Sequence, residues 1–142
     1  MEQWKREIVL GNRDFEARDF LEALLHYRRA LAVARRLFAH WPDADEAVAA
    51  LVIAHHNMAD LLRHMSHIDE AAGHLCSAHR CLQQAITDPH LPEALREAAK
   101  RHTPRTLAEL QRFSRECCRH PEVVRTLSSR CAQCPRASRL LH

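Results

Sequence analysis

Glycine and aromatic residues are scarce in this chain: 2 of its 142 residues are glycine, and Phe, Trp and Tyr together make up 5%. Tight turns and β-bulges depend on glycine, so this composition argues against a sheet protein with many loops. Runs of β-branched residues, which strands favour, are nearly absent as well. Ala, Leu, Arg and Glu dominate instead, and all four are good helix formers. We therefore expect an all-α domain.

Long apolar segments are also missing. No run of apolar residues approaches the roughly 20 residues that a membrane-spanning helix needs. Residues 1–7 are mostly charged or polar and lack the apolar core of a signal peptide. We therefore expect a cytoplasmic protein with no membrane partner, whose 6 cysteines are reduced thiols unless they bind a metal.

Neither sign of charge predominates, since the chain has 21 basic and 18 acidic residues and a net charge of +3. This balance argues against nucleic acid as a partner. The lysines are Lys5 and Lys100 alone, so arginine carries nearly all of the positive charge, which suggests a bacterial protein from a GC-rich genome. The motifs of serine hydrolases, P-loop proteins and dinucleotide-binding domains are absent. We therefore expect a protein that is not an enzyme and uses no cofactor.

Two segments of the chain repeat one pattern about 48 residues apart. The first runs from Gly11 to Leu31 and the second from Ala59 to Ala78. Each predicts a helix, a tight turn and a second helix. Such a pair cannot bury its apolar face alone, so it has to stack on a neighbouring pair. The residues after Pro92 predict a third, degraded copy, because the last copy of a stack is often atypical.

Small and large residues alternate at Gly11, Phe20, Ala23, Tyr27 and Ala30 in the first copy, and at Ala59, Ile68, Ala71, Leu75 and Ala78 in the second. This alternation resembles the tetratricopeptide repeat. The resemblance covers residues 4–81 and implies a right-handed stack of two to three antiparallel helix pairs, with five to six helices. The family period is about 34 residues, so the helices here should be longer than usual.

Apolar spacing and proline positions predict where the helices begin and end. Either Asp43 or Asp45 is the expected N-cap of the third helix. Pro104 interrupts the fifth helix, which either kinks there, the favoured reading, or ends so that Thr103 caps a new helix. We expect residues 1–130 to form the helical domain and residues 131–142 a tail. The predicted helices cover residues 2–17, 20–40, 44–65, 68–87, a stretch from about 92 to before 120, and 122–129.

The resemblance implies a function as well as a fold. In tetratricopeptide proteins the first helix of each pair lines a concave groove that binds a peptide or a partner protein. We therefore expect a non-enzymatic adaptor that binds a protein or peptide, and self-association as a homodimer is an open possibility through apolar residues of the last pair. The groove residues that the resemblance assigns are Lys5, Asn12, Glu16, His56, Asp60, Arg63, His64, Arg105, Gln111 and Arg112.

Cysteine and histidine clusters leave a different function open, namely metal binding or metal sensing. Near the C-terminus, the side chains with Zn²⁺-like spacing are Cys118, His120, Cys131 and Cys134. The third and fourth helices carry pairs at i, i+3, which are His64 with His67 and Cys76 with His79. The competing interpretations are a reduced, loose tail and ordinary surface histidines. A further alternative is an accessory subunit of a larger complex.

Overall fold

The computed structural model describes residues 2–117 and 120–132, and within these ranges it contains six helices and no strand. This confirms the prediction of an all-α fold. The helices are α1 (Glu2–Glu16), α2 (Phe20–Leu37), α3 (Ala44–His64), α4 (Ile68–Thr87), α5 (Glu93–Glu116) and α6 (Pro121–Ala132).

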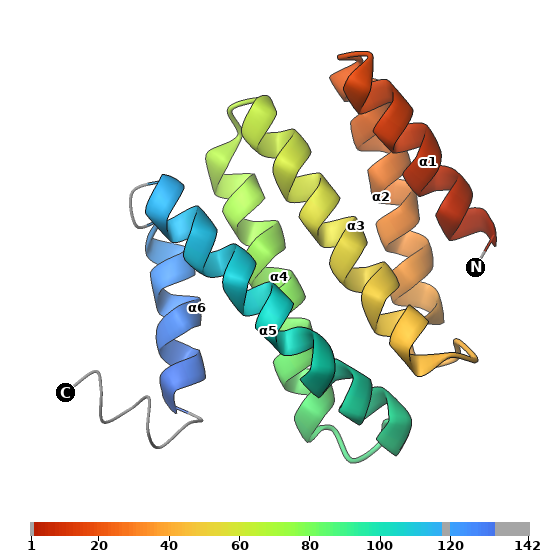
Figure 1. Ribbon diagram of the computed structural model, residues 1–142, viewed down its shortest axis with the longest axis vertical. Helices are drawn as coiled ribbons and strands as arrows, with labels where there is room; N and C mark the ends of the chain where they lie inside the picture. Colours follow the sequence, from red (N-terminus) through yellow and green to blue (C-terminus); the bar gives the residue numbers. More distant parts are fainter. Residues whose placement is uncertain (1, 118–119, 133–142) are drawn as a thin grey trace.

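The helices form antiparallel pairs that stack side by side. Each helix packs against the next one along the chain, and α3 also packs against α5. Figure 1 shows the resulting order, with α1 and α2 at one end of the stack, α3 and α4 in the middle, and α5 and α6 at the other end. The predicted stack of helix pairs is therefore present, whereas its assignment to the tetratricopeptide class stays a prediction.

The turns inside the first two pairs are built in the same way. Arg18 and Ser66 lie 48 residues apart and both adopt left-handed backbone, with φ of 64° and 65°. After each, the next amide donates to a carbonyl five residues back, from Asp19 to Asp14 at 2.8 Å and from His67 to Leu62 at 2.8 Å. This Schellman arrangement satisfies the last carbonyls of α1 and α3 without glycine. The turns therefore confirm the repeat period that the sequence predicts.

The observed helix bounds match most predicted ones within one residue, but α2 ends three residues earlier than predicted, and α6 ends at Ala132, three residues later. Asp43 is the N-cap of α3, since its carboxylate accepts a hydrogen bond from the Glu46 amide at 3.1 Å. Pro104 lies inside one continuous helix, so Thr103 does not cap a new one. The Thr103 hydroxyl donates to the Ala99 carbonyl instead, at 2.8 Å. The predicted tail, residues 131–142, lies outside the described residues except for the last two residues of α6.

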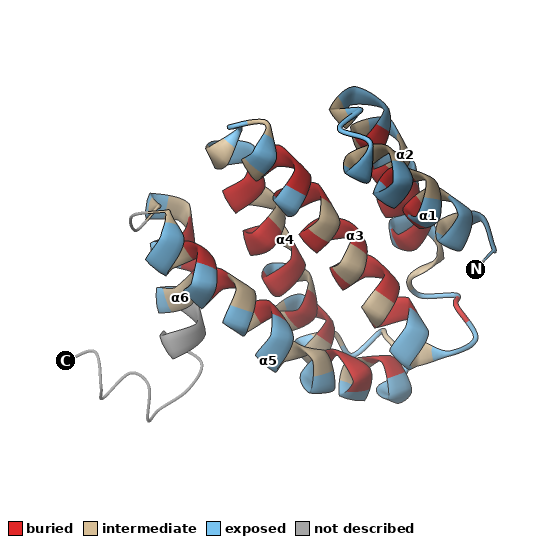
Figure 2. Cartoon of the chain, turned by 45° about the horizontal axis from the view of Figure 1, so that its top comes forward, coloured by how far each residue is buried: buried red, intermediate tan, exposed pale blue. Residues whose placement is uncertain are grey.

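Burial is concentrated where the helices meet one another. Figure 2 shows buried positions along the facing sides of the helices and exposed positions on the outer sides. The central helix α3 is the most buried, with 12 of its 21 residues in the interior. The core forms three clusters along the stack, represented by Ile8, Tyr27 and Leu61, by Leu51, Leu82 and Leu95, and by Leu75, Leu110, Phe113 and Val123.

The contact between Gly11 and Tyr27 sets the distance between α1 and α2. The Tyr27 ring lies so close to Gly11 that an added Cβ would be only 2.6 Å from Tyr27 Cδ1. Tyr27 is itself only 2% exposed, so the ring has no room to move away. In the second pair the matching positions are Ala59 and Leu75, which lie in one core cluster, so the smaller leucine accompanies a residue that has a methyl group. Gly11 is therefore required by packing and not by backbone conformation.

We predict that Gly11→Ala destabilises the protein by about 1–3 kcal/mol, the usual cost of inserting a methyl group into a packed core. The measurement is the free energy of unfolding from urea denaturation. Gly73→Ala is the matched control, because the nearest atom to an added Cβ at Gly73 is 4.0 Å away. In the middle of α4 that substitution should stabilise the protein by about 0.5–1 kcal/mol. Equal effects of the two substitutions would contradict the packing role of Gly11.

Candidate functional site

A groove of about 690 Å³ opens along one face of the stack. All but one of its lining side chains come from α1, α3 and α5, the first helices of the three pairs. This is the arrangement that the sequence resemblance implies for a binding surface. The groove is lined by Asn12, Phe15, Glu16, Tyr27, Asn57, Asp60, Arg63, His64 and Arg112.

The structure brings six of the predicted groove residues together, and these are Asn12, Glu16, Asp60, Arg63, His64 and Arg112. Lys5, Arg105 and Gln111 are exposed outside the groove. His56 was also expected to line it, but this side chain is only 8% exposed and lies in the interior. The reason is that α3 packs against helices on both of its sides. The His56 side chain, which the repeat pattern assigns to the groove, is therefore buried between helices.

Phe15, Tyr27 and Asn57 line the groove although the sequence did not assign them to it. Both aromatic side chains belong to the core cluster of the first helix pair and also border the groove, so they contribute to both. Asn57 precedes Asp60 by three residues and therefore shares its side of α3. That spacing was the available signal for Asn57.

Tyr27 links the core to the groove. Its hydroxyl donates a hydrogen bond to Asn12 Oδ1 at 2.5 Å. The pKa of Tyr27 is raised to about 12, mainly by burial and to a smaller extent by the nearby carboxylates of Asp60, Glu16 and Asp14. The hydroxyl therefore stays protonated at neutral pH and remains a donor. Since Asn12 accepts this bond through Oδ1, its Nδ2 group is available to donate to a ligand.

Carboxylates hold the two arginines of the groove, and each arginine has one such partner on a neighbouring helix. Arg63 on α3 pairs with Glu116 of α5 at 2.8 Å, and its guanidinium lies over the Phe113 ring, 5.5 Å from the centroid. Arg112 on α5 contacts Glu109 at 2.6 Å and Asp60 at 3.8 Å. Partial burial raises the pKa of Asp60, and Arg112 opposes this shift. These pairs fix the direction of the arginines and leave the groove with both signs of charge.

His64 lines the groove, and its imidazole packs edge-on against Phe15 with ring centroids 4.9 Å apart. Its Nδ1 is bonded to the Asp60 carbonyl at 3.0 Å. His67, which the i, i+3 spacing pairs with His64 as a candidate metal ligand, contacts Glu70 at 3.4 Å. The structure thus gives the two histidines separate environments.

Histidines 55 and 56 are buried in α3. His55 Nδ1 lies 3.1 Å from His74 Nδ1, and the Nε2 atoms of His55 and His56 are buried without a hydrogen-bond partner. Burial lowers the pKa of His55 to about 3 and that of His56 to about 4. For His55, the neighbouring His74 and Arg35 add to this shift. Both imidazoles are therefore neutral at physiological pH.

The predicted cysteine and histidine metal sites are only partly within the described residues. Cys118, Cys134 and the side chain of Cys131 lie outside them, whereas His120 Nε2 contacts Asp69 at 2.7 Å. In the other predicted pair, His79 Nδ1 bonds to Thr106 at 2.8 Å, and burial raises the pKa of the Cys76 thiol. Across the described part of the chain, the one group of three ligand atoms lies elsewhere, at Asp14, Glu22 and His26.

The exposed surface of the described residues carries four large apolar side chains, Val9, Leu21, Leu25 and Val124. Three of them lie on the first helix pair, whereas the sequence placed the self-association surface on the last pair. Within residues 2–117 and 120–132, no helix combines the length and apolar character that crossing a bilayer requires.

Fold and groove together define a class: an all-helical protein made of stacked antiparallel helix pairs, with a polar groove along the first helices of the pairs. The chain belongs to the family of proteins of unknown function DUF2753, whose model matches residues 2–139. This match spans all six helices. No curated protein and no solved structure matches the chain.

We predict that the stability of the fold decreases as the pH falls below 6.5. The pKa values of His55 and His56 are lower in the folded state than in the unfolded state, so the unfolded chain binds more protons between pH 6.5 and about 4. Each of the two histidines should contribute a slope of up to about 1.4 kcal/mol per pH unit in this range. The measurement is the free energy of unfolding in urea at a series of pH values.

A matched pair of variants separates these histidines from the others. His56→Gln removes one buried titrating group and should flatten the pH dependence of stability. His40→Gln removes an exposed histidine and should leave that dependence unchanged. If both variants showed the same pH dependence of stability, the pKa of His56 in the folded protein would not be lowered by burial, and the prediction would be wrong.

Proposed function

We propose that this protein is a non-enzymatic adaptor whose groove binds a short, extended segment of a peptide or partner protein. The observation that carries the proposal is the gathering of hydrogen-bonding and charged side chains from three successive first helices onto one groove. Its volume of about 690 Å³ falls within the range of about 300–1,000 Å³ that is typical of ligand sites. The groove therefore suits a few residues of extended chain.

The side chains of the groove fit the chemistry of a peptide. Asn12 and Asn57 lie on α1 and α3. Asn57 offers both a donor and an acceptor to a peptide main chain, and Asn12 offers the Nδ2 donor. Asn12 is preorganised because Tyr27 holds its Oδ1 atom, so less entropy is lost when a ligand binds. Arg63 and Arg112 offer planar donors to carboxylates or carbonyls of the ligand.

The charge pattern of the groove also restricts its partner. Glu16 and Asp60 lie beside Arg63 and Arg112, so a strongly acidic or strongly basic ligand would meet repulsion somewhere along the groove. A segment that carries both signs of charge fits better. The resemblance to tetratricopeptide repeats supports the same proposal independently, because that family binds peptides and proteins along its first helices.

We predict that peptides selected from a random library on the full chain bind the groove, and that Arg112→Ala weakens them about tenfold. This loss corresponds to removal of one charge-assisted hydrogen bond, worth about 1.5 kcal/mol or more. Affinities would be measured by isothermal titration calorimetry. Arg105→Ala is the matched control, because Arg105 lies on the same helix, is exposed and does not line the groove.

The comparison between these two variants decides the proposal. Arg112 makes exposed ion pairs with Asp60 and Glu109, whose loss costs little stability, so the variant should fold normally. Peptides that bind both variants as tightly as the original protein would place the binding surface elsewhere. A selection that enriches no sequence would contradict peptide binding itself.

A further inference from the structure

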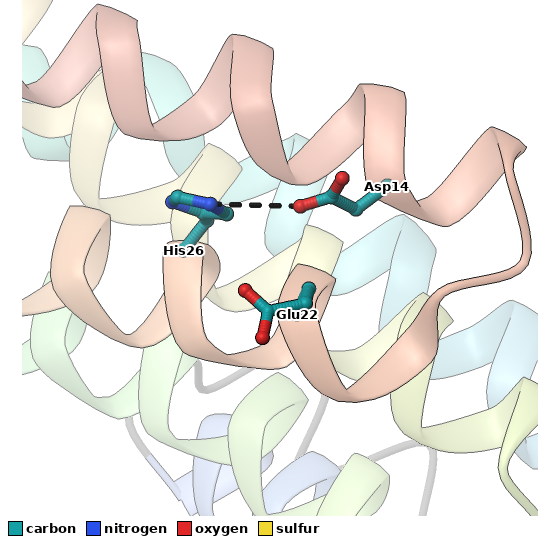
Figure 3. Close-up of side chains that lie close together, drawn as sticks. All are labelled: Asp14, Glu22 and His26. Atoms are coloured by element: carbon teal, nitrogen blue, oxygen red, sulfur yellow. Dashed lines mark ion pairs between the residues drawn. The ribbon is translucent and has the colours of Figure 1, made fainter.

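Away from the groove, three potential metal ligands converge between α1 and α2. The Asp14 and Glu22 carboxylates and the His26 imidazole each offer one ligand atom, and these atoms all lie within 4.8 Å of one another. Figure 3 shows Asp14 on α1 facing His26 on α2, with Glu22 one turn before His26 on the same helix. None of the three side chains lines the groove.

The orientation of the His26 ring is fixed by a fourth residue, Glu7. His26 Nδ1 lies 2.7 Å from Glu7 Oε2, a distance at which Nδ1 carries a proton and donates it. The other nitrogen, Nε2, is 3.5 Å from Asp14 Oδ2. A neutral ring in this tautomer directs the lone pair of Nε2 toward the carboxylates, which repel it. A cation at Nε2, either a proton or a metal ion, removes this repulsion.

The charges of the cluster favour a cation with more than one positive charge. Glu7, Asp14 and Glu22 together carry three negative charges, and a protonated His26 balances only one of them. Among the described residues, the ion pairs of Glu7 and Asp14 are both made with His26. Excess negative charge beside an oriented imidazole is the usual environment of a divalent metal site.

We propose that Asp14, Glu22 and His26 bind a divalent first-row transition metal. One imidazole nitrogen and two carboxylate oxygens suit Mn²⁺, Co²⁺ and Zn²⁺, whereas Ca²⁺ and Mg²⁺ take oxygen ligands. Adjacent ligand atoms of such a metal are about 3 Å apart, since each lies about 2.1 Å from it. The 3.5 Å between Asp14 Oδ2 and His26 Nε2 is close to this value, and a rotation of the exposed Glu22 side chain, whose carboxylate lies within 4.8 Å of both, would complete the site.

The position of the site predicts what the metal does. Its ligands come from both helices of the first pair, so a bound ion links α1 to α2 and stabilises the folded chain in proportion to its affinity. Glu22 is exposed, which leaves the remaining coordination positions to water. In this arrangement Glu7 does not touch the metal. It holds the imidazole in the tautomer whose Nε2 can ligate, which is a common role of carboxylates behind metal-binding histidines.

The test is a titration of the full chain with Mn²⁺, in which electron paramagnetic resonance measures the free ion. Mn²⁺ is the chosen probe because it prefers oxygen and imidazole ligands, so the cysteines contribute little. We expect one Mn²⁺ per chain, and selective broadening of the amide NMR signals around Asp14, Glu22 and His26. Broadening centred elsewhere would overturn the proposal.

Two glutamate variants give the matched comparison. Glu22→Gln should weaken Mn²⁺ binding at least tenfold without affecting folding, because Glu22 is exposed. Glu93→Gln should leave binding unchanged, although Glu93 is likewise exposed in the first turn of its helix. Equal affinities of the two variants would overturn the proposal, as would the absence of saturable binding to the original chain.

Two further measurements test the roles of His26 and Glu7. Ca²⁺ should compete poorly with Mn²⁺, and competition at equal concentration would show that carboxylates alone bind the ion. Glu7→Gln should weaken binding by about 10–100-fold, the usual effect of removing a carboxylate behind a metal-binding histidine. An unchanged affinity in Glu7→Gln would contradict the role of Glu7 in orienting the ring.

Discussion

The close packing of Tyr27 against Gly11 is the contact on which the first helix pair depends. It brings α1 and α2 together because no other residue at position 11 leaves room for the ring. It also directs the buried Tyr27 hydroxyl to the groove, where it donates a hydrogen bond to Asn12. The interior of the pair and the geometry of its candidate binding surface are therefore set by one side chain.

The central helix α3 has to satisfy two requirements that conflict. It packs against helices on both sides, so most of its residues are buried, yet it also provides Asn57, Asp60, Arg63 and His64 to the groove. Its two adjacent histidines lie on the buried side, where only the neutral imidazole is tolerated. This makes the stability of the whole stack sensitive to acid, because α3 contacts four of the five other helices.

The first helix pair carries both proposed sites on different sides. Asn12, Phe15 and Glu16 of α1 line the groove, whereas Asp14 forms part of the proposed metal site with α2. The two sites share no ligand, so each proposal can fail without the other. A metal that links α1 to α2 would nevertheless hold the helix that presents Asn12, which gives the metal site a physical connection to the groove.

The amino-acid sequence by itself determined the all-α fold, most of the helix bounds and the period of 48 residues, because these follow from local composition, apolar spacing and turn chemistry. It also identified six of the groove residues, through the resemblance of the repeats. The tertiary structure decided the rest. It turned His56 inward, brought Tyr27 to the edge of the groove, and assembled Glu7, Asp14, Glu22 and His26 from two helices. Each of these depends on how far one helix is rotated against its neighbour, and local sequence patterns do not encode that rotation.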